Sequence, residues 1–217
     1  MKKIAIFNNK GGVAKTTSVI NLAYSLSDFG KRVLVVDCDT QENCFTFFLS
    51  QGSTELILST DYENISHTTW ERYTQLPAEP DGFDYIIFDM PPFISDGIRK
   101  IIRQSDVVYV PTILGEFEIA GLRKVTEEIN TQGVDLGGIF VTMYQPKNDA
   151  EIIKEFREIL KDRLMTTVIP FSTTVRESQK ANLPIEAYFK EKGVPKTKTS
   201  WKLVKSYEDL ALEIMRG

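Results

Sequence analysis

The sequence Ile4-Ala-Ile-Phe-Asn-Asn-Lys-Gly-Gly-Val-Ala-Lys-Thr-Thr17 carries the strongest indication of the fold. Its first residues form an apolar run typical of a buried strand, and helical spacing begins at Thr16. Two glycines and Lys15 stand between them. A strand, a glycine-rich turn and a helix that opens with Lys-Thr can cradle phosphate, because backbone N–H groups and the helix N-terminus face the oxygens. The stretch therefore predicts a phosphate-binding loop.

The loop departs from the usual short pattern, G-x-x-x-x-G-K-[ST]. Lys10 stands where that pattern has its first glycine, and Ala14 stands where it has the second. Alanine is tolerated in a tight loop only where its φ is negative. A plain turn between strand and helix is the alternative interpretation, and carboxylates at neighbouring strand ends favour the phosphate site.

Short apolar runs alternate with helical segments along the rest of the chain. Such runs predict parallel strands that are covered on both faces. Strands are expected over 3–8, 32–37, 84–89, 106–111, 138–143 and 166–170, and helices over 16–29, 95–104, 119–130, 149–163, 175–181 and 206–215. The weaker pattern of 41–80 predicts a helix, a short strand and loops. We expect one α/β domain over 1–217, a three-layer P-loop fold with a mostly parallel twisted sheet between helices.

Three carboxylates follow predicted strands, at the edge where such sheets bind ligands. Asp89 closes its strand at the place where P-loop proteins hold the carboxylate that steadies Mg²⁺. Asp37 and Asp39 flank Cys38, and strand alternation sends both side chains the same way. One can support Mg²⁺ while the other orients the attacking water. The alternatives are a turn-forming Asp89 and a solvated acidic turn at 37–39.

Composition excludes several classes of protein. The 26 Lys and Arg against 30 Asp and Glu give a net charge of −4, so nucleic-acid binding requires a local patch. No apolar run reaches the length of a membrane span, and the run after Met1 ends too early for a secretory leader. Cys38 and Cys44 make no disulfide framework, and we expect them to be ordinary core or loop residues of a cytoplasmic protein.

Several motifs together resemble the ParA/MinD group of ATPases. Lys10-Gly-Gly-Val-Ala-Lys-Thr-Thr17 is similar to its deviant Walker A motif, K-G-G-x-x-K-T-T. Val35-Val-Asp-Cys-Asp-Thr-Gln41 resembles the V-D-x-D-P-Q segment of the ParA (Soj) partition branch, with Thr40 in place of proline. Ile87-Phe-Asp-Met-Pro-Pro92 resembles its D-x-P-P segment, and Gly138–Tyr144 and Thr167–Pro170 resemble its last two strands. The resemblance covers nearly the whole chain and is weakest over 45–80.

The resemblance implies a role for each matching residue. Lys10 would be the signature lysine that reaches the phosphates of a partner subunit, and Lys10, Lys15 and Asp39 would be catalytic, with Asp39 positioning water. Thr16, Asp37 and Asp89 would serve Mg²⁺. ATP would be bound by Lys10, Gly11, Gly12, Val13, Ala14, Lys15, Thr16 and Thr17, and its adenine by Met143, Pro170 and Phe171.

The resemblance also implies the function. ATP would drive formation of a homodimer that binds DNA without sequence preference, on the nucleoid, for plasmid or chromosome partition. Slow hydrolysis, stimulated by a ParB-type partner, would release the dimer. The segment from Arg176 to Lys205 has eight basic and three acidic residues, a local charge of +5. The predicted DNA contacts are Arg176, Lys180, Lys196, Lys198 and Lys202.

Other positioning ATPases remain alternatives. A MinD-like membrane switch would use a basic amphipathic C-terminal helix, but acidic residues occupy the polar side of this one, and Leu203, Tyr207, Leu210 and Ile214 are expected to pack on the sheet. No membrane partner is therefore expected. A protein-cluster positioning ATPase also fits. An iron–sulfur ATPase would need cysteines placed to bridge a dimer, and a tyrosine kinase would normally carry a tyrosine-rich tail. Neither feature is expected of this chain. His67 is expected at the surface.

Overall fold

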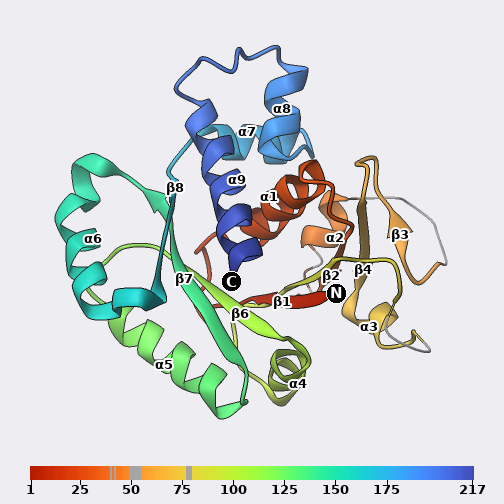
Figure 1. The fold of residues 1–217 in the computed structure, drawn as a ribbon, viewed down its shortest axis with the longest axis horizontal. Helices are drawn as coiled ribbons and strands as arrows, with labels where there is room; N and C mark the ends of the chain where they lie inside the picture. The colour runs from red at the N-terminus through yellow and green to blue at the C-terminus, as the bar shows by residue number, and fades with distance from the viewer. Residues whose placement is uncertain (40, 42, 49–54, 77–79) are drawn as a thin grey trace.

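The centre of the computed structural model is an eight-stranded sheet, in the order β3-β4-β2-β5-β1-β6-β7-β8 (Figure 1). The structure describes residues 1–217 except 40, 42, 49–54 and 77–79. Neighbouring strands are parallel, except that β3 and β4 are antiparallel. The strands are β1 (Lys2–Ile6), β2 (Val33–Asp37), β3 (Leu58–Ser59), β4 (Ile65–Thr69), β5 (Tyr85–Asp89), β6 (Val107–Thr112), β7 (Asp135–Tyr144) and β8 (Leu164–Pro170). The predicted mostly parallel sheet is confirmed.

Helices cover both faces of this sheet, which makes three layers (Figure 1). Ile4 and Ile6 of β1 join a core with α1 and α9, whereas Ala5 and Phe7 join a core with α4, α5 and α6. Alternate residues of a strand point to opposite faces, so central strands need apolar residues throughout. The helices are α1 (Lys15–Asp28), α2 (Asn43–Phe47), α3 (Trp70–Tyr73), α4 (Asp96–Gln104), α5 (Glu118–Thr131), α6 (Pro146–Leu160), α7 (Thr174–Lys180), α8 (Ile185–Glu191) and α9 (Trp201–Arg216), with a 3₁₀ turn over Lys161–Arg163.

All six predicted strands and all six predicted helices are present, with boundaries that move by a few residues. Gly30 ends α1 with a φ of +72°, as expected for a helix stop. Helix α9 begins five residues before its predicted start at 206. No helix was predicted between 181 and 206, so α8, which buries Ile185 and Phe189, was missed. Within 41–80 the described part of the chain has two short helices and two strands.

His67 is buried, and the prediction of a surface position is wrong. It lies on β4 beside Val35 of β2, is 1% exposed, and packs against the ring of Phe48 at a centroid distance of 5.8 Å. Burial, and then the charge of Arg72, lower the pKa of His67 to about 4. The imidazole is therefore neutral in the folded protein at neutral pH.

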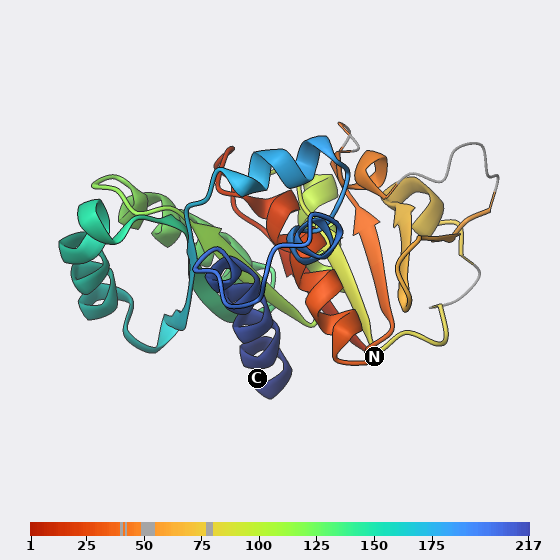
Figure 2. The ribbon, with the colours of Figure 1, turned by 90° about the horizontal axis from the view of Figure 1, so that it is seen from above.

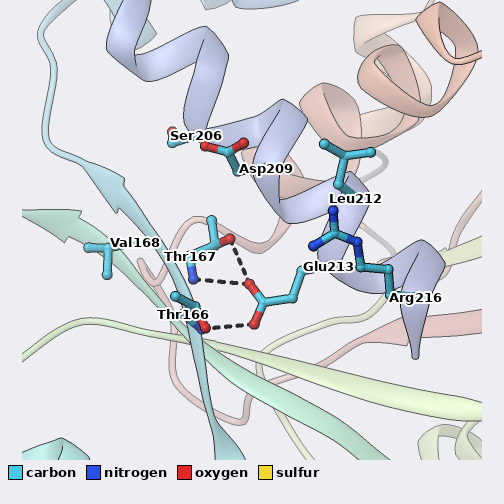
Figure 3. Close-up of a pocket in the computed structure, with 8 residues that line it drawn as sticks. All are labelled: Thr166, Thr167, Val168, Ser206, Asp209, Leu212, Glu213 and Arg216. Atoms are coloured by element: carbon cyan, nitrogen blue, oxygen red, sulfur yellow. Dashed lines mark hydrogen bonds between the residues drawn. The ribbon is translucent and has the colours of Figure 1, made fainter.

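The apolar side of helix α9 packs in the protein core, as predicted. Leu203, Tyr207, Leu210 and Ile214 are all buried in the core that α9 shares with α1. Its acidic side has a structural role, because the Glu213 carboxylate accepts hydrogen bonds from the edge strand β8 (Figure 3). Among the described residues, no helix is long and apolar enough to span a bilayer.

The cysteines occupy ordinary core and loop positions, as predicted, and two aromatic residues join α8 to α9. The rings of Phe189 and Trp201 pack at 5.5 Å, and the indole N–H of Trp201 donates to the Val194 carbonyl at 3.0 Å. Cys44 is buried and Cys38 is half-buried. The two contacts of Trp201 join α9 to α8 and to the segment that follows α8.

Candidate nucleotide-binding site

The carboxyl ends of three central strands lie side by side and form the floor of the site. Asp37 at the end of β2 is in register with Asp89 at the end of β5, and Asp89 is in register with Ile6 of β1. The Cys38 N–H donates to the Asp89 carbonyl at 3.0 Å. The loop after β1 therefore begins beside both acidic strand ends, at the edge of the sheet that the sequence predicted.

The loop is braced by neighbouring strands through polar contacts. The Asn8 side chain accepts a hydrogen bond from Lys10 N at 3.0 Å and donates to the Pro111 carbonyl of β6 at 2.8 Å. The Thr142 hydroxyl of β7 donates to the Val13 carbonyl at 3.2 Å. Sequence reasoning missed Asn8 and Thr142 as loop supports, although Asn8 is a buried polar residue at a strand end and could have drawn attention.

Two loop residues adopt left-handed backbone conformations. Gly12 has a φ of +75° and Ala14 a φ of +61°. The condition under which Ala14 would be relaxed, a negative φ, is therefore not met. Left-handed backbone costs a non-glycine residue roughly 1–2 kcal/mol, which α1 and the braced loop must offset. A Cβ on Gly11 or Gly12 would meet nothing within 4 Å, so the space above the loop is open.

Lys15 and Thr17 lie in the first turn of α1, directly after the loop. The Lys15 side chain is buried, and its ammonium donates to the Lys10 carbonyl at 3.0 Å. Burial lowers the pKa of Lys15, while the charges of Asp89 and Asp39 raise it. The Thr17 hydroxyl accepts a hydrogen bond from Gln179 Nε2 at 3.1 Å, because α7 lies beside the start of α1 (Figure 2).

Asp89 is a buried carboxyl group with unmet hydrogen-bonding capacity. It is 1% exposed, and no described residue makes a hydrogen bond of normal geometry to either of its side-chain oxygens. Burial and then the charge of Asp37 raise its pKa to about 8, although the nearby Thr16 hydroxyl and Lys15 favour the charged form. Buried charge without compensation is costly. A cation beside Thr16 would relieve that cost.

The two aspartates after β2 take different positions. Asp39 is half-buried and lines the hollow over the loop, whereas Asp37 is buried and does not line it. Asp37 Oδ1 accepts a hydrogen bond from Asp39 N at 3.0 Å, so Asp37 helps to orient its neighbour. Thr40, which stands where the resembled family has proline, lies outside the described residues.

Two adjoining hollows form the cleft, and they share Ala14 and Thr17. One, of about 210 Å³, is lined by Gly11, Gly12, Ala14, Lys15, Thr16, Thr17, Asp39 and Pro92. The other, of about 200 Å³, is lined by Ala14, Thr17, Thr142, Met143, Ile169, Pro170, Phe171, Ser172, Val175, Arg176, Gln179 and Tyr207. The structure thus brings the residues predicted for adenine next to those predicted for phosphate. Val13 is buried and contributes through its carbonyl.

Lys10 does not line either hollow. Its side chain is 47% exposed, and its ammonium forms an ion pair with Glu118 in the first turn of α5. No motif or spacing indicates this contact, which joins residues 108 positions apart.

The basic residues between Arg176 and Lys205 divide into paired and unpaired groups. Lys190, Lys192 and Lys205 form ion pairs with nearby acidic side chains. The five residues predicted to contact DNA form no ion pair with a described residue. Lys196, Lys198 and Lys202 line a hollow of about 460 Å³ with Trp201, and Lys196 lies over the Trp201 ring at 5.4 Å. Arg176 instead lines the predicted adenine hollow, and Lys180 ends α7.

Mg²⁺ and a nucleotide fit the residues at this site. The open space over Gly11 and Gly12 can accept phosphate, and Lys15 supplies positive charge. The buried Asp89 carboxyl, with Thr16 beside it, offers the oxygen ligands that Mg²⁺ prefers. The second hollow has apolar side chains for a base and polar groups at its rim.

Comparisons with known proteins agree with this geometry. The family profile for the CobQ/CobB/MinD/ParA nucleotide-binding domain matches residues 4–185. The chromosome-partitioning ATPase Soj of Treponema pallidum is 28% identical, over 99% of this chain and 97% of that protein.

Solved structures share the fold. The cell division ATPase MinD of Pyrococcus furiosus superposes with a TM-score of 0.77 at 24% identity, over 99% of this chain and 98% of that one. The septum site-determining protein MinD of Pyrococcus horikoshii, complexed with Mg-ADP, gives a TM-score of 0.75 at 20% identity, over 98% and 95%. The predicted P-loop fold is thereby confirmed.

Proposed function

This chain belongs to the CobQ/CobB/MinD/ParA nucleotide-binding family, and on that premise we propose that it is a ParA-type switch for DNA partition. In this proposal it binds ATP and Mg²⁺, pairs with a second copy, and binds DNA without sequence preference. Hydrolysis then returns it to the unpaired state. The name of the Treponema pallidum relative, a chromosome-partitioning ATPase, supports a role in DNA partition.

The observation that carries the proposal is the arrangement around Asp89. Its buried carboxyl group lies beside Thr16 and Lys15, under a loop whose outer space is open. If Asp89 had only a structural role, the folded protein would bear the free-energy cost of burying its carboxyl group without a compensating interaction. A site for a metal-bound triphosphate uses the same group productively.

Each residue of the site has a role in the proposed reaction. Lys15 and the loop N–H groups hold the phosphates in line for attack by water. Asp39 lines the phosphate hollow and orients that water, while Asp37 fixes the Asp39 backbone. Thr16 and Asp89 would hold Mg²⁺, which would offset the charge that develops on the phosphate oxygens. Met143, Pro170 and Phe171 hold the base, and Lys10 serves the second copy.

The proposed DNA contacts are centred on Lys196, Lys198 and Lys202. These lysines have no acidic partner among the described residues, so their charge is available to phosphates. Lys180 can extend this contact, whereas the position of Arg176 suits the nucleotide better. Pairing of two copies would double the number of contacts and steepen the salt dependence. A ParB-type protein would stimulate hydrolysis, and the complex would reside on the nucleoid.

Two assays test the proposal. ATP hydrolysis by the wild-type protein should be slow but measurable, and Lys15→Ala should abolish it together with nucleotide binding. With a non-hydrolysable ATP analogue, binding to random duplex DNA should weaken steeply as salt increases. Lys198→Ala should reduce that slope, and Lys154→Ala, in an exposed α6 ion pair with Glu151, should leave it unchanged. Salt-insensitive or absent DNA binding would contradict the DNA part, and equal turnover by Lys15→Ala would contradict the catalytic part.

A further inference from the structure

Lys10 is held away from the phosphate hollow by a contact within its own chain. Its main chain is fixed at both ends of the residue, because its N–H donates to Asn8 Oδ1 at 3.0 Å and its carbonyl accepts from Lys15 Nζ at 3.0 Å. Only the side chain of Lys10 is free to change its partner. In this structure its ammonium forms an ion pair with the Glu118 carboxylate.

Glu118 is the fixed member of this pair. Its side chain is only 12% exposed, whereas that of Lys10 is 47% exposed. Glu118 N donates to the Gly115 carbonyl at 3.2 Å, and a Cβ on Gly115 would lie 3.4 Å from Glu118 Cγ. The Gly115 backbone therefore lies close against the Glu118 side chain. The adjoining Phe117 is 85% exposed, so the pair lies at the surface and the lysine can leave outward.

We propose that Glu118 is a positioning residue that holds Lys10 in reserve and sets the threshold for pairing of two copies. This inference rests on the proposed function, in which Lys10 contacts the nucleotide of the second copy. Lys10 must break its ion pair with Glu118 before it can make that contact. A triphosphate carries more negative charge than one carboxylate, so it can compete for the ammonium. The carboxylate therefore opposes pairing until that charge is presented.

The size of the effect follows from the exposure of the pair. An ion pair of this kind changes an equilibrium constant by a factor of about 1.4 to 5. A symmetric pair of copies breaks two of them, so loss of the carboxylate should tighten pairing by roughly 2-fold to 30-fold. Nucleotide affinity of the single copy should not change, because Lys10 lines neither hollow of its own chain.

The test compares Glu118→Gln with Glu116→Gln, a matched loss of charge at an exposed residue two positions away. Light scattering across a protein dilution series, with Mg²⁺ and a non-hydrolysable ATP analogue, gives the dissociation constant of the pair. Analogue affinity is measured separately at protein concentrations where single copies predominate. We expect a smaller dissociation constant for Glu118→Gln alone, with unchanged analogue affinity. General damage to the fold would not tighten pairing.

Three results would overturn the inference. Glu118→Gln could pair no more tightly than wild type, both variants could tighten equally, or analogue affinity could change in step with pairing. If wild-type protein binds the analogue but never doubles its mass, the pairing step of the proposed function fails and this inference fails with it. If wild type pairs and Glu118→Gln matches it, the proposed function stands and only the role of Glu118 is refuted.

Discussion

Replacement of Asp89 by asparagine should stabilise the nucleotide-free protein while removing its response to Mg-nucleotide. Asp89 is buried, and its pKa is about 8 in the folded chain against 3.8 for an ordinary aspartate. Because the folded state raises this pKa, it binds more protons than the unfolded state between those values. The free energy of unfolding of the wild type therefore falls as pH rises through this window.

The expected magnitude follows from those two pKa values. Through Asp89, each pH unit between about 4 and 8 removes about 1.4 kcal/mol from the wild type, a contribution that Asp89→Asn lacks. At pH 7 the accumulated cost is about 4 kcal/mol, and the buried asparagine amide itself costs about 1–3 kcal/mol. Asp89→Asn should thus be more stable than wild type by about 1–3 kcal/mol at pH 7.

Urea denaturation of both proteins at several pH values, without nucleotide, measures this difference. Asp84→Asn is the control of opposite sign, since Asp84 accepts a hydrogen bond from Arg32 N at 2.8 Å and this contact lowers its pKa. A saturating Mg-nucleotide, at about 100 times its Kd, should add about 2.7 kcal/mol to the wild type and little to Asp89→Asn. A stability difference that stays constant with pH would show that Asp89 does not titrate with a raised pKa in the folded protein.

Three further outcomes are expected. Asp39→Ala should slow ATP hydrolysis by at least about 100-fold in single-turnover assays while ATP stays bound, and hydrolysis at the wild-type rate would rule out its water-orienting role. The folded state lowers the pKa of His67 to about 4, so the free energy of unfolding of the wild type should fall by up to about 3 kcal/mol relative to His67→Gln as pH falls from about 6.5 to 4. Urea denaturation measures this loss. By NMR, the one imidazole signal of the chain should titrate near pH 4, and titration near 6.5 would contradict the prediction. Glu213→Ala should cost about 2–4 kcal/mol in thermal or urea unfolding, because the carboxylate accepts hydrogen bonds from Thr166 N, Thr167 N and Thr167 Oγ1 at 2.8, 3.0 and 2.7 Å; a loss below about 0.5 kcal/mol would contradict it.

The central sheet could be predicted from sequence because its strands are buried on both faces. Runs such as Val33–Asp37 and Tyr85–Asp89 are nearly all apolar, and glycine or proline follows several of them. Strand β4 was not resolved in advance, since Ile65 is its only aliphatic residue and its other buried positions are polar, His67 among them. Burial of polar residues depends on tertiary neighbours that periodicity does not reveal.

The candidate site was predictable where its parts are local. The loop from Lys10 to Thr17 is one continuous segment, so its spacing alone placed Lys15 and Thr16 at the start of a helix. The contact between Lys10 and Glu118 depends on how the loops after β1 and β6 meet, which spacing cannot give. A count of basic residues likewise grouped Arg176 with the lysines near Trp201, although the fold directs it to a different hollow.

The most direct test of the account is the mass of the protein in solution with different nucleotides. The proposed pairing requires a triphosphate in the cleft, with Lys10 of each copy contacting the nucleotide of the other. Light scattering should therefore show mass near 24.7 kDa without nucleotide or with Mg-ADP, and twice that value with Mg²⁺ and a non-hydrolysable ATP analogue. An unchanged mass with the analogue bound, or equal doubling with ADP, would contradict it.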